Sequence, residues 1–181
     1  VRGADLSKLG MDRVRSDHMG MLATLINALA LEDALMHAGM EAVVQSSFPV
    51  GGVAEPFRRE RAVRHLEEGK VVIFACGTGN PFFTTDTAAA LRAAEVGAEV
   101  VLKGTHSAEG VYDRDPAKFE DAVKLDRLTY EEVLKMGLRA MDITAVSFCM
   151  ERKLPIVVFN ILTPGNLRRA VSGEAVGTKI A

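Results

Sequence analysis

Lys70–Asp86, KVVIFACGTGNPFFTTD, is the stretch of sequence that decides the fold. It begins with a continuous apolar, β-branched run, which is typical of a strand buried on both faces of a parallel sheet. A glycine-rich turn follows, and Thr85–Val96 then has the alanine-rich composition of a helix that ends before Gly97. A buried strand that leads through a glycine turn into a helix predicts an α/β fold with a mainly parallel sheet.

The same alternation of strand and helix extends in both directions from this stretch. Further strands are predicted within Glu41–Phe48, at Ala98–Lys103 and at Pro155–Asn160. Further helices are predicted at Asp17–Gly39, Phe57–Glu68, Tyr130–Met136, Met141–Arg152 and Pro164–Ser172. The polar segment Gly104–Ala122 interrupts the alternation and is expected to be a long functional loop.

Composition narrows the class of protein. The 181 residues, 48% of them hydrophobic, suit one domain over residues 1–181 with a sizeable core. A formal net charge of −2 gives no basic excess for nucleic acid, and we expect no nucleic-acid partner. Neither an 18-residue apolar run nor a signal pattern is found in the sequence, so we expect a cytoplasmic protein without a membrane span. Cys76 and Cys149 are expected to be reduced, buried thiols, and the four histidines lack the spacing of metal ligands.

The turn Cys76–Asp86 has the composition of a ligand-binding loop. Gly77 and Gly79 let the backbone approach a ligand, and the following helix N-terminus offers N–H groups to an anion. Phe82 and Phe83 offer an apolar face to a ring, so the turn suits a nucleotide. The simpler alternative is a strand-to-helix turn capped by a threonine.

Asp86 conflicts with a bound phosphate, because the two negative charges repel each other. We therefore expect Asp86 to be turned away, to hold a basic group, or to lie near Mg²⁺. The turn is not a Walker A loop, because no Gly-Lys-Ser/Thr follows the glycines. It is not a dinucleotide fingerprint either, because Phe82 occupies the place of the third glycine.

Two other stretches carry candidate ligand groups. After the strand Ala98–Lys103, Thr105 could bond a base or phosphate, Tyr112 could stack on a ring, and Asp115 could accept from a ribose hydroxyl. Taken alone, however, this stretch is better explained as a solvated loop with Tyr112 as a hydrophobic plug. In Arg13–Met21, Ser16 or Asp17 is expected to cap the long helix.

Together these stretches resemble the bacterial UMP kinases of the amino-acid kinase superfamily. The motifs that carry the resemblance are DHMGMLAT at Asp17–Thr24, GTGNPFFTTD at Gly77–Asp86, VVLKGT and GVYDRDP within Val100–Pro116, LPIVVFN at Leu154–Asn160 and GTKI at Gly177–Ile180. They occur in the family's order and span the whole chain.

The resemblance implies a three-layer α/β/α sandwich of the carbamate kinase type and phosphoryl transfer from ATP to UMP. It places the UMP contacts on Asp17, Thr78, Gly79, Asn80, Pro81, Phe82, Phe83, Thr84 and Thr85. It places the ATP contacts on Arg2, Thr105, Tyr112 and Asp115, with Arg2 also near the transferred phosphoryl group. Arg2 and Asp86 are the candidate catalytic residues. It further implies Mg²⁺ with ATP, a homohexamer, activation by GTP and inhibition by UTP; no protein ligand of the metal is assigned.

Some features leave alternatives open. The family's K-L-S-G-E and G-G-G-N loops would lie upstream of Val1, so we expect an N-terminally incomplete domain. Thr105–Gly110 is a little longer than the family's T-K-V-D-G. One alternative is a related kinase acting on acetylglutamate, aspartate or carbamate, although Phe82-Phe83 suits a base-bearing substrate better. The other is a protein that senses uridine nucleotides without catalysis.

Overall fold

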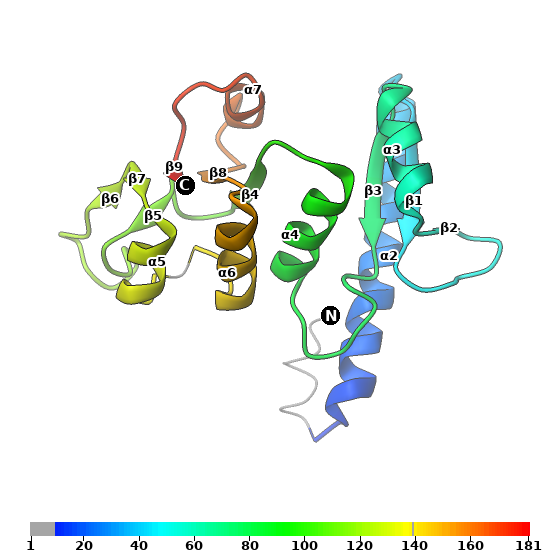
Figure 1. Ribbon diagram of the computed structural model, residues 1–181, viewed down its shortest axis with the longest axis horizontal. Helices are drawn as coiled ribbons and strands as arrows, with labels where there is room; N and C mark the ends of the chain where they lie inside the picture. Colours follow the sequence, from blue (N-terminus) through cyan, green and yellow to red (C-terminus); the bar gives the residue numbers. More distant parts are fainter. Residues whose placement is uncertain (1–9, 139) are drawn as a thin grey trace. The chain divides into compact units, whose positions relative to one another are not determined.

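The computed structural model describes residues 10–138 and 140–181, and Figure 1 shows its helices and strands along the chain. The helices are α2 (Arg13–His37), α3 (Arg59–Glu67), α4 (Thr85–Val96), α5 (Tyr130–Met136), α6 (Ile143–Arg152) and α7 (Asn166–Val171). The strands are β1 (Ala42–Ser46), β2 (Glu55–Pro56), β3 (Val71–Ala75), β4 (Val101–Thr105), β5 (Val111–Tyr112), β6 (Lys124–Leu125), β7 (Arg127–Leu128), β8 (Ile156–Asn160) and β9 (Thr178–Ile180). Internal contacts divide the chain into two compact units, Val1–Ala88 and Ala89–Ala181, which are described separately. The single domain expected from length remains a prediction.

The first unit is built on a parallel sheet in the order β2-β1-β3. β1 and β3 pair along their whole length, from Ala42 opposite Val71 to Ser46 opposite Ala75. Helix α2 contacts both strands, and its apolar residues join theirs in one core made of Met21, Leu25, Ala28, Val44, Ala75 and Cys76. Complete burial of one such large side chain contributes about 1.5–3 kcal/mol to folding, so this packing fixes α2 on the sheet.

Helix α2 begins four residues before the predicted start, and its cap is a different residue. The side chain of Asp12 accepts a hydrogen bond from the amide of Arg15 at 3.0 Å, which is the geometry of an N-cap. The prediction that Ser16 or Asp17 caps the helix is therefore wrong, because both lie inside its first turns. At the other end Gly39 follows the helix with φ 80°, as predicted from its sequence position.

Among the residues that the structure describes, α2 is also the one helix whose length and composition would allow it to cross a membrane. The mean hydropathy of its most apolar 18-residue window is 1.4. This is weak evidence for a membrane span, because a helix that packs on a sheet in a globular domain meets the same criterion. Helix α2 packs on a sheet in this way, because it contacts β1 and β3.

The second unit is built on a mixed sheet in the order β4-β8-β9-β7. β4 pairs with β8 in parallel, β8 with β9 antiparallel, and β7 with β9 in parallel. Its core includes Val133, Val146, Cys149, Ile156, Val158 and Ile180, from helices α5 and α6 and strands β8 and β9. The predicted α/β class with mainly parallel sheets is confirmed.

The expected loop Gly104–Ala122 contains more regular structure than its polar composition predicted. β4 continues to Thr105, and β5 pairs with β6 as a small antiparallel sheet. Strands of two residues, such as Val111–Tyr112, are too short to show the alternation from which strands are recognised.

Candidate functional site

The loop from Cys76 to Thr85 leaves β3 at its carboxyl end, where ligands bind in open α/β sheets. Four of its residues have positive φ: Cys76 at 66°, Gly77 at 57°, Gly79 at 79° and Phe82 at 72°. Glycine adopts this conformation without strain, whereas Cys and Phe do so at a cost. A Cβ added to Gly79 would lie 3.2 Å from the Cβ of Ser47, so that glycine also lets the loop closely approach the residue that follows β1. The loop therefore has a fixed, unusual backbone shape.

Asp17 connects this loop to helix α2. Its Oδ2 atom accepts a hydrogen bond from the Phe82 amide at 2.8 Å, and its carboxylate accepts from Nε of Arg13 at 2.9 Å. Partial burial acts to raise the pKa of Asp17, but these two hydrogen bonds and the charge of Arg13 outweigh it, so the pKa lies below its usual value. Asp17 is therefore ionised near neutral pH and keeps the capacity to accept further hydrogen bonds.

The side chains of the loop divide into two groups. Phe82 and Phe83 are 65% and 53% exposed, and the guanidinium of Arg13 lies 5.7 Å from the centre of the Phe82 ring. Thr78 and Asn80 hydrogen-bond each other through side chain and backbone. Exposed rings beside a cation and a set of short polar groups suit a flat, anionic ligand.

Thr84, at the end of the loop, confirms the simpler alternative of a turn in which a threonine caps the following helix. Oγ1 of Thr84 accepts from the amides of Asp86 and Thr87 at 3.1 and 3.2 Å, so Thr84 caps α4. Thr85 is the first residue of that helix, and Asp86 lies in its first turn. The cap orders the helix end that closes the loop.

The second unit has its own pocket, of about 450 Å³, lined by both Tyr112 and Asp115. The other lining residues are Ala108, Gly110, Val111, Asp113, Arg114, Pro116, Lys118, Phe119, Met136, Gly137 and Leu138. Arg114 lies 5.7 Å from the centre of the Phe119 ring. Aromatic and aliphatic walls next to charged groups suit a planar polar ligand such as a nucleotide base.

Two of the predicted residues of this unit, Thr105 and Asp115, form hydrogen bonds with the protein backbone. The hydroxyl of Thr105 donates to the carbonyl oxygens of Ala108 and Phe159, so it fixes the end of β4, and it does not line the pocket. Oδ1 of Asp115 accepts from the amide of Ala117 at 3.0 Å and shapes the turn that follows. The predicted ATP-side residues are therefore brought together only in part.

A buried threonine outside the predicted set holds the pocket wall. Thr178 of β9 is fully buried, and its Oγ1 accepts from the amide of Val111 at 2.8 Å. It also donates to the carbonyl oxygen of Leu125, so one hydroxyl joins β9 to both strands of the small sheet. The GTKI motif contained Thr178, but the sequence did not indicate its partners, which lie far away along the chain.

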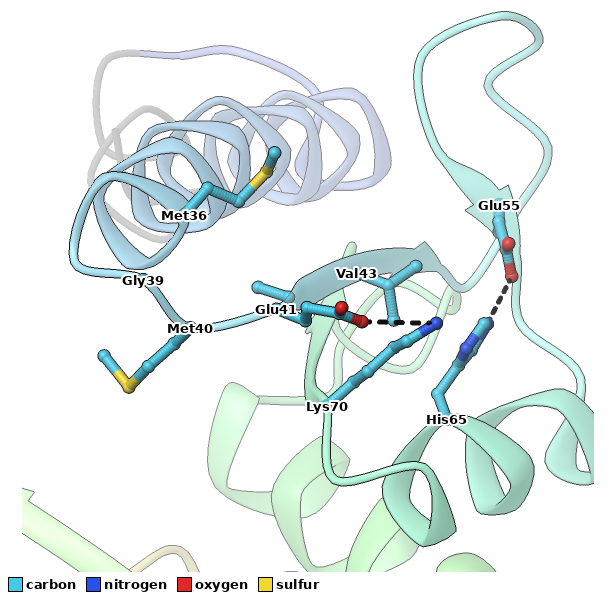
Figure 2. A pocket seen from close by; sticks show the side chains of 9 residues that line it. Met36, Gly39, Met40, Glu41, Val43, Glu55, His65 and Lys70 are labelled. Atoms are coloured by element: carbon cyan, nitrogen blue, oxygen red, sulfur yellow. Dashed lines mark hydrogen bonds and ion pairs between the residues drawn. The ribbon is translucent and has the colours of Figure 1, made fainter.

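Another pocket, of about 660 Å³, lies in the first unit where α2 ends and β1 and β3 begin. Figure 2 shows Met36 and Met40 on one side, with Glu41 facing Lys70 and Glu55 facing His65. Lys70 also lies 3.0 Å from Glu68, so its charge is already paired. This pocket is at the opposite end of the strands from the loop Cys76–Thr85, so it is not part of the site at that loop.

Arg2 lies outside the described residues, so its predicted role remains a prediction. The sequence did not indicate other groups at the site: Arg114, Phe119 and Leu138 of the second unit's pocket, and Ser47, whose hydroxyl donates to the carbonyl of Gly77 at 2.5 Å. Of these residues, only Arg114 could have been found from the sequence, because it lies within the GVYDRDP motif.

Comparison with known proteins gives a family match over most of the chain. The model of the amino acid kinase family matches residues 3–160. The chain belongs to this family. It therefore has the fold of the amino acid kinases, as predicted, and it is a kinase.

Three solved structures show which amino acid kinases are similar. The UMP kinase of Bacillus anthracis is 39% identical, with a TM-score of 0.95 over 99% of this chain and 74% of that one. The UMP kinase of Ureaplasma parvum is 35% identical, with a TM-score of 0.93, and the match covers 99% of this chain and 77% of that one. The uridylate kinase of Archaeoglobus fulgidus is 31% identical, with a TM-score of 0.75 over 99% and 78%.

Proposed function

We propose that this amino acid kinase is a UMP kinase, which transfers the γ-phosphoryl group of ATP to UMP. An oxygen of the UMP phosphate attacks the γ-phosphorus, the bond to the β–γ bridging oxygen breaks, and UDP and ADP are formed. The observation that carries the proposal is the loop Cys76–Thr85, with its fixed backbone shape and exposed Phe82 and Phe83. Similarity to UMP kinases supports it.

On the acceptor side, the loop would bind UMP from base to phosphate. The rings of Phe82 and Phe83 offer an apolar face to uracil, and Thr78 and Asn80 offer short hydrogen-bonding groups. Asp17 is ionised and can accept more hydrogen bonds than those from Phe82 and Arg13, so it would accept one from a ribose hydroxyl. The remaining loop residues, Gly79, Pro81, Thr84 and Thr85, would contribute backbone shape and helix-end N–H groups.

On the donor side, the pocket of the second unit would bind the nucleoside of ATP. Tyr112 and Phe119 bring aromatic surface to the base, and Asp115 brings a carboxylate for ribose hydroxyls. The hydroxyl of Thr105 is hydrogen-bonded to backbone carbonyls of the protein, so Thr105 would contribute by fixing the backbone at the end of β4. Thr105, Tyr112 and Asp115 are thus the ATP-side residues of the proposal.

Phosphoryl transfer needs positioning and charge neutralisation rather than covalent chemistry from the protein. In the described residues, no three His, Cys, Asp or Glu side chains gather to hold a metal ion. Mg²⁺ commonly binds through nucleotide phosphates with few protein ligands, so we propose that it enters with ATP and neutralises phosphate charge. Arg2 is proposed to offset charge on the moving group, and Asp86 to orient a basic group.

The proposal includes three properties of the whole protein: assembly as a homohexamer, activation by GTP with inhibition by UTP, and residence in the cytoplasm. Exposed apolar side chains on α2, including Leu22 and Ile26, support assembly, because contact between copies would cover them. Sedimentation equilibrium measures the assembly, and initial rates with each nucleotide measure the effectors.

The decisive experiment is a coupled assay of ADP release with ATP and Mg²⁺ and a panel of acceptors. UMP should be phosphorylated, and CMP, acetylglutamate, aspartate and carbamate should not. Turnover of one of the small carboxylates instead would favour another amino acid kinase. UMP binding by calorimetry without any turnover would favour a uridine nucleotide sensor.

A further inference from the structure

The loop that we assign to UMP begins at a backbone position that needs outside support. β3 ends at Ala75, and Cys76 then turns with φ 66° while completely buried. The Cys76 amide donates to Oγ1 of Thr24 on helix α2 at 2.9 Å. A buried N–H group without a partner is strongly unfavourable, so this hydroxyl allows the chain to turn where it does.

The orientation of the Thr24 hydroxyl is itself determined. Its hydrogen is donated to the carbonyl of Met21, one turn earlier in α2, at 2.7 Å. The oxygen lone pairs are then left for the Cys76 amide. Serine retains both functions, whereas valine has nearly the same shape and neither of them.

The other end of the loop is attached to the same helix. Phe82, again with positive φ, donates its amide to Asp17, which lies seven positions before Thr24. Seven residues are about two helical turns, so Asp17 and Thr24 lie on one face of α2. The segment Gly77–Pro81 is held between these two attachments, and it contains four of the residues assigned to UMP.

We propose that Thr24 is a positioning residue for the acceptor nucleotide: through the Cys76 amide it sets the shape of the loop that binds UMP. The inference rests on the proposed function. Thr24 itself touches no substrate. Its loss should therefore weaken UMP binding while the fold and the ATP side are retained.

The test compares steady-state constants of the full chain with those of Thr24→Val and Thr24→Ser. Thr24→Val should raise KM for UMP at least tenfold and change KM for ATP less than twofold, and Thr24→Ser should stay within threefold of wild type. The matched control is Thr178→Val, which removes a buried hydroxyl that likewise accepts from a backbone amide, in the other unit. KM for UMP should be unchanged in this control.

An unchanged KM for UMP in Thr24→Val, no rescue by serine, or an equal rise in Thr178→Val would overturn the assignment. If Thr24→Val does not fold, amide exchange in the wild-type protein decides. UMP should slow exchange at Cys76 and Phe82 together, and slowing at Phe82 alone would contradict the role of Thr24. The wild-type assay comes first: without UMP turnover or binding the proposed function fails and this inference with it, whereas an active wild type with a normal Thr24→Val contradicts only the inference.

Discussion

Asp17 accepts the backbone amide of Phe82 at 2.8 Å, although the two residues are 65 positions apart in the chain. The contact joins the first turns of α2 to the residue at which the loop bends with φ 72°. A bulky residue in this conformation persists only where its surroundings hold it. Asp17 is thus a structural part of the loop as well as a candidate ligand group.

Replacement of Asp17 should separate these two roles. Asp17→Ala removes every acceptor, so we expect KM for UMP to rise about 10- to 100-fold, as for loss of a charged hydrogen-bonding group worth about 1.5–3 kcal/mol. Asp17→Asn keeps one oxygen, so amide exchange at Phe82 should stay slower than in the alanine variant. Asp12→Ala is the control: it removes the helix cap at the same end of α2 and should cost about 1 kcal/mol of stability with KM for UMP unchanged.

The pH dependence of this contact follows from the lowered pKa of Asp17. A carboxyl that titrates lower in the folded state stabilises that state above its unfolded pKa, near 3.8, and loses the contribution as pH falls through the folded value. The Phe82 amide shift in NMR should therefore titrate with a midpoint below 3.8. A titration midpoint above 3.8 would contradict the ion pair with Arg13 and the hydrogen bond from Phe82.

The glycines of the loop can be tested against a glycine of matching conformation. Gly79 and Gly39 have φ of 79° and 80°, but an added Cβ at Gly79 meets Ser47 whereas one at Gly39 meets open space. Both alanine variants should lose about 1 kcal/mol from the left-handed backbone. Only Gly79→Ala should raise KM for UMP, by tenfold or more, in the coupled assay. Equal effects of the two variants would mean that close packing of the loop against Ser47 is unimportant for binding.

Much of the fold was predictable because its strands are long enough to show their chemistry. Val71–Ala75 and Ile156–Asn160 are apolar and β-branched, and both proved to be strands of parallel pairs. Strands β5, β6, β7 and β9 span only two or three residues and exist because partners distant in sequence pair with them. No local pattern carries that information.

The candidate site was predictable only where a motif is continuous. The run Gly77–Asp86 marked the loop itself, but the partners of its backbone, Thr24 and Ser47, come from elements far away in sequence. The sequence favours Asp17 as a helix cap, because a carboxylate near a predicted helix start usually has that role. Asp12, five residues earlier, has it instead.

The pocket of the second unit gives a prediction about Thr178. Because Oγ1 of Thr178 satisfies the buried Val111 amide, Thr178→Val should lower the free energy of unfolding by about 1–3 kcal/mol and loosen the strand that carries Tyr112. We expect KM for ATP to rise several-fold. The control is Thr144→Val, the same change at an exposed position of α6, which should stay within about 0.5 kcal/mol of wild type. An unchanged KM for ATP in Thr178→Val would mean that the small sheet of β5 and β6 keeps its shape without the Thr178 hydroxyl.

The buried thiol of Cys149 makes stability depend on pH in the alkaline range. Burial raises the pKa of Cys149 from 9.0 to about 11. Between these values the unfolded chain has lost the thiol proton and the folded chain keeps it, so the free energy of unfolding falls as pH rises; below 9.0 this contribution is fully present. Urea denaturation at pH 8, 9, 10 and 11 should show this decline, and Cys149→Ala should make it shallower. A residual slope should remain, because burial still raises the pKa values of Tyr130 and Cys76, and the hydrogen bond with Glu68 still raises that of Lys70. Rapid reaction of Cys149 with a thiol reagent at pH 8 in the folded protein would contradict its burial, because a thiol with so high a pKa has almost no thiolate at that pH.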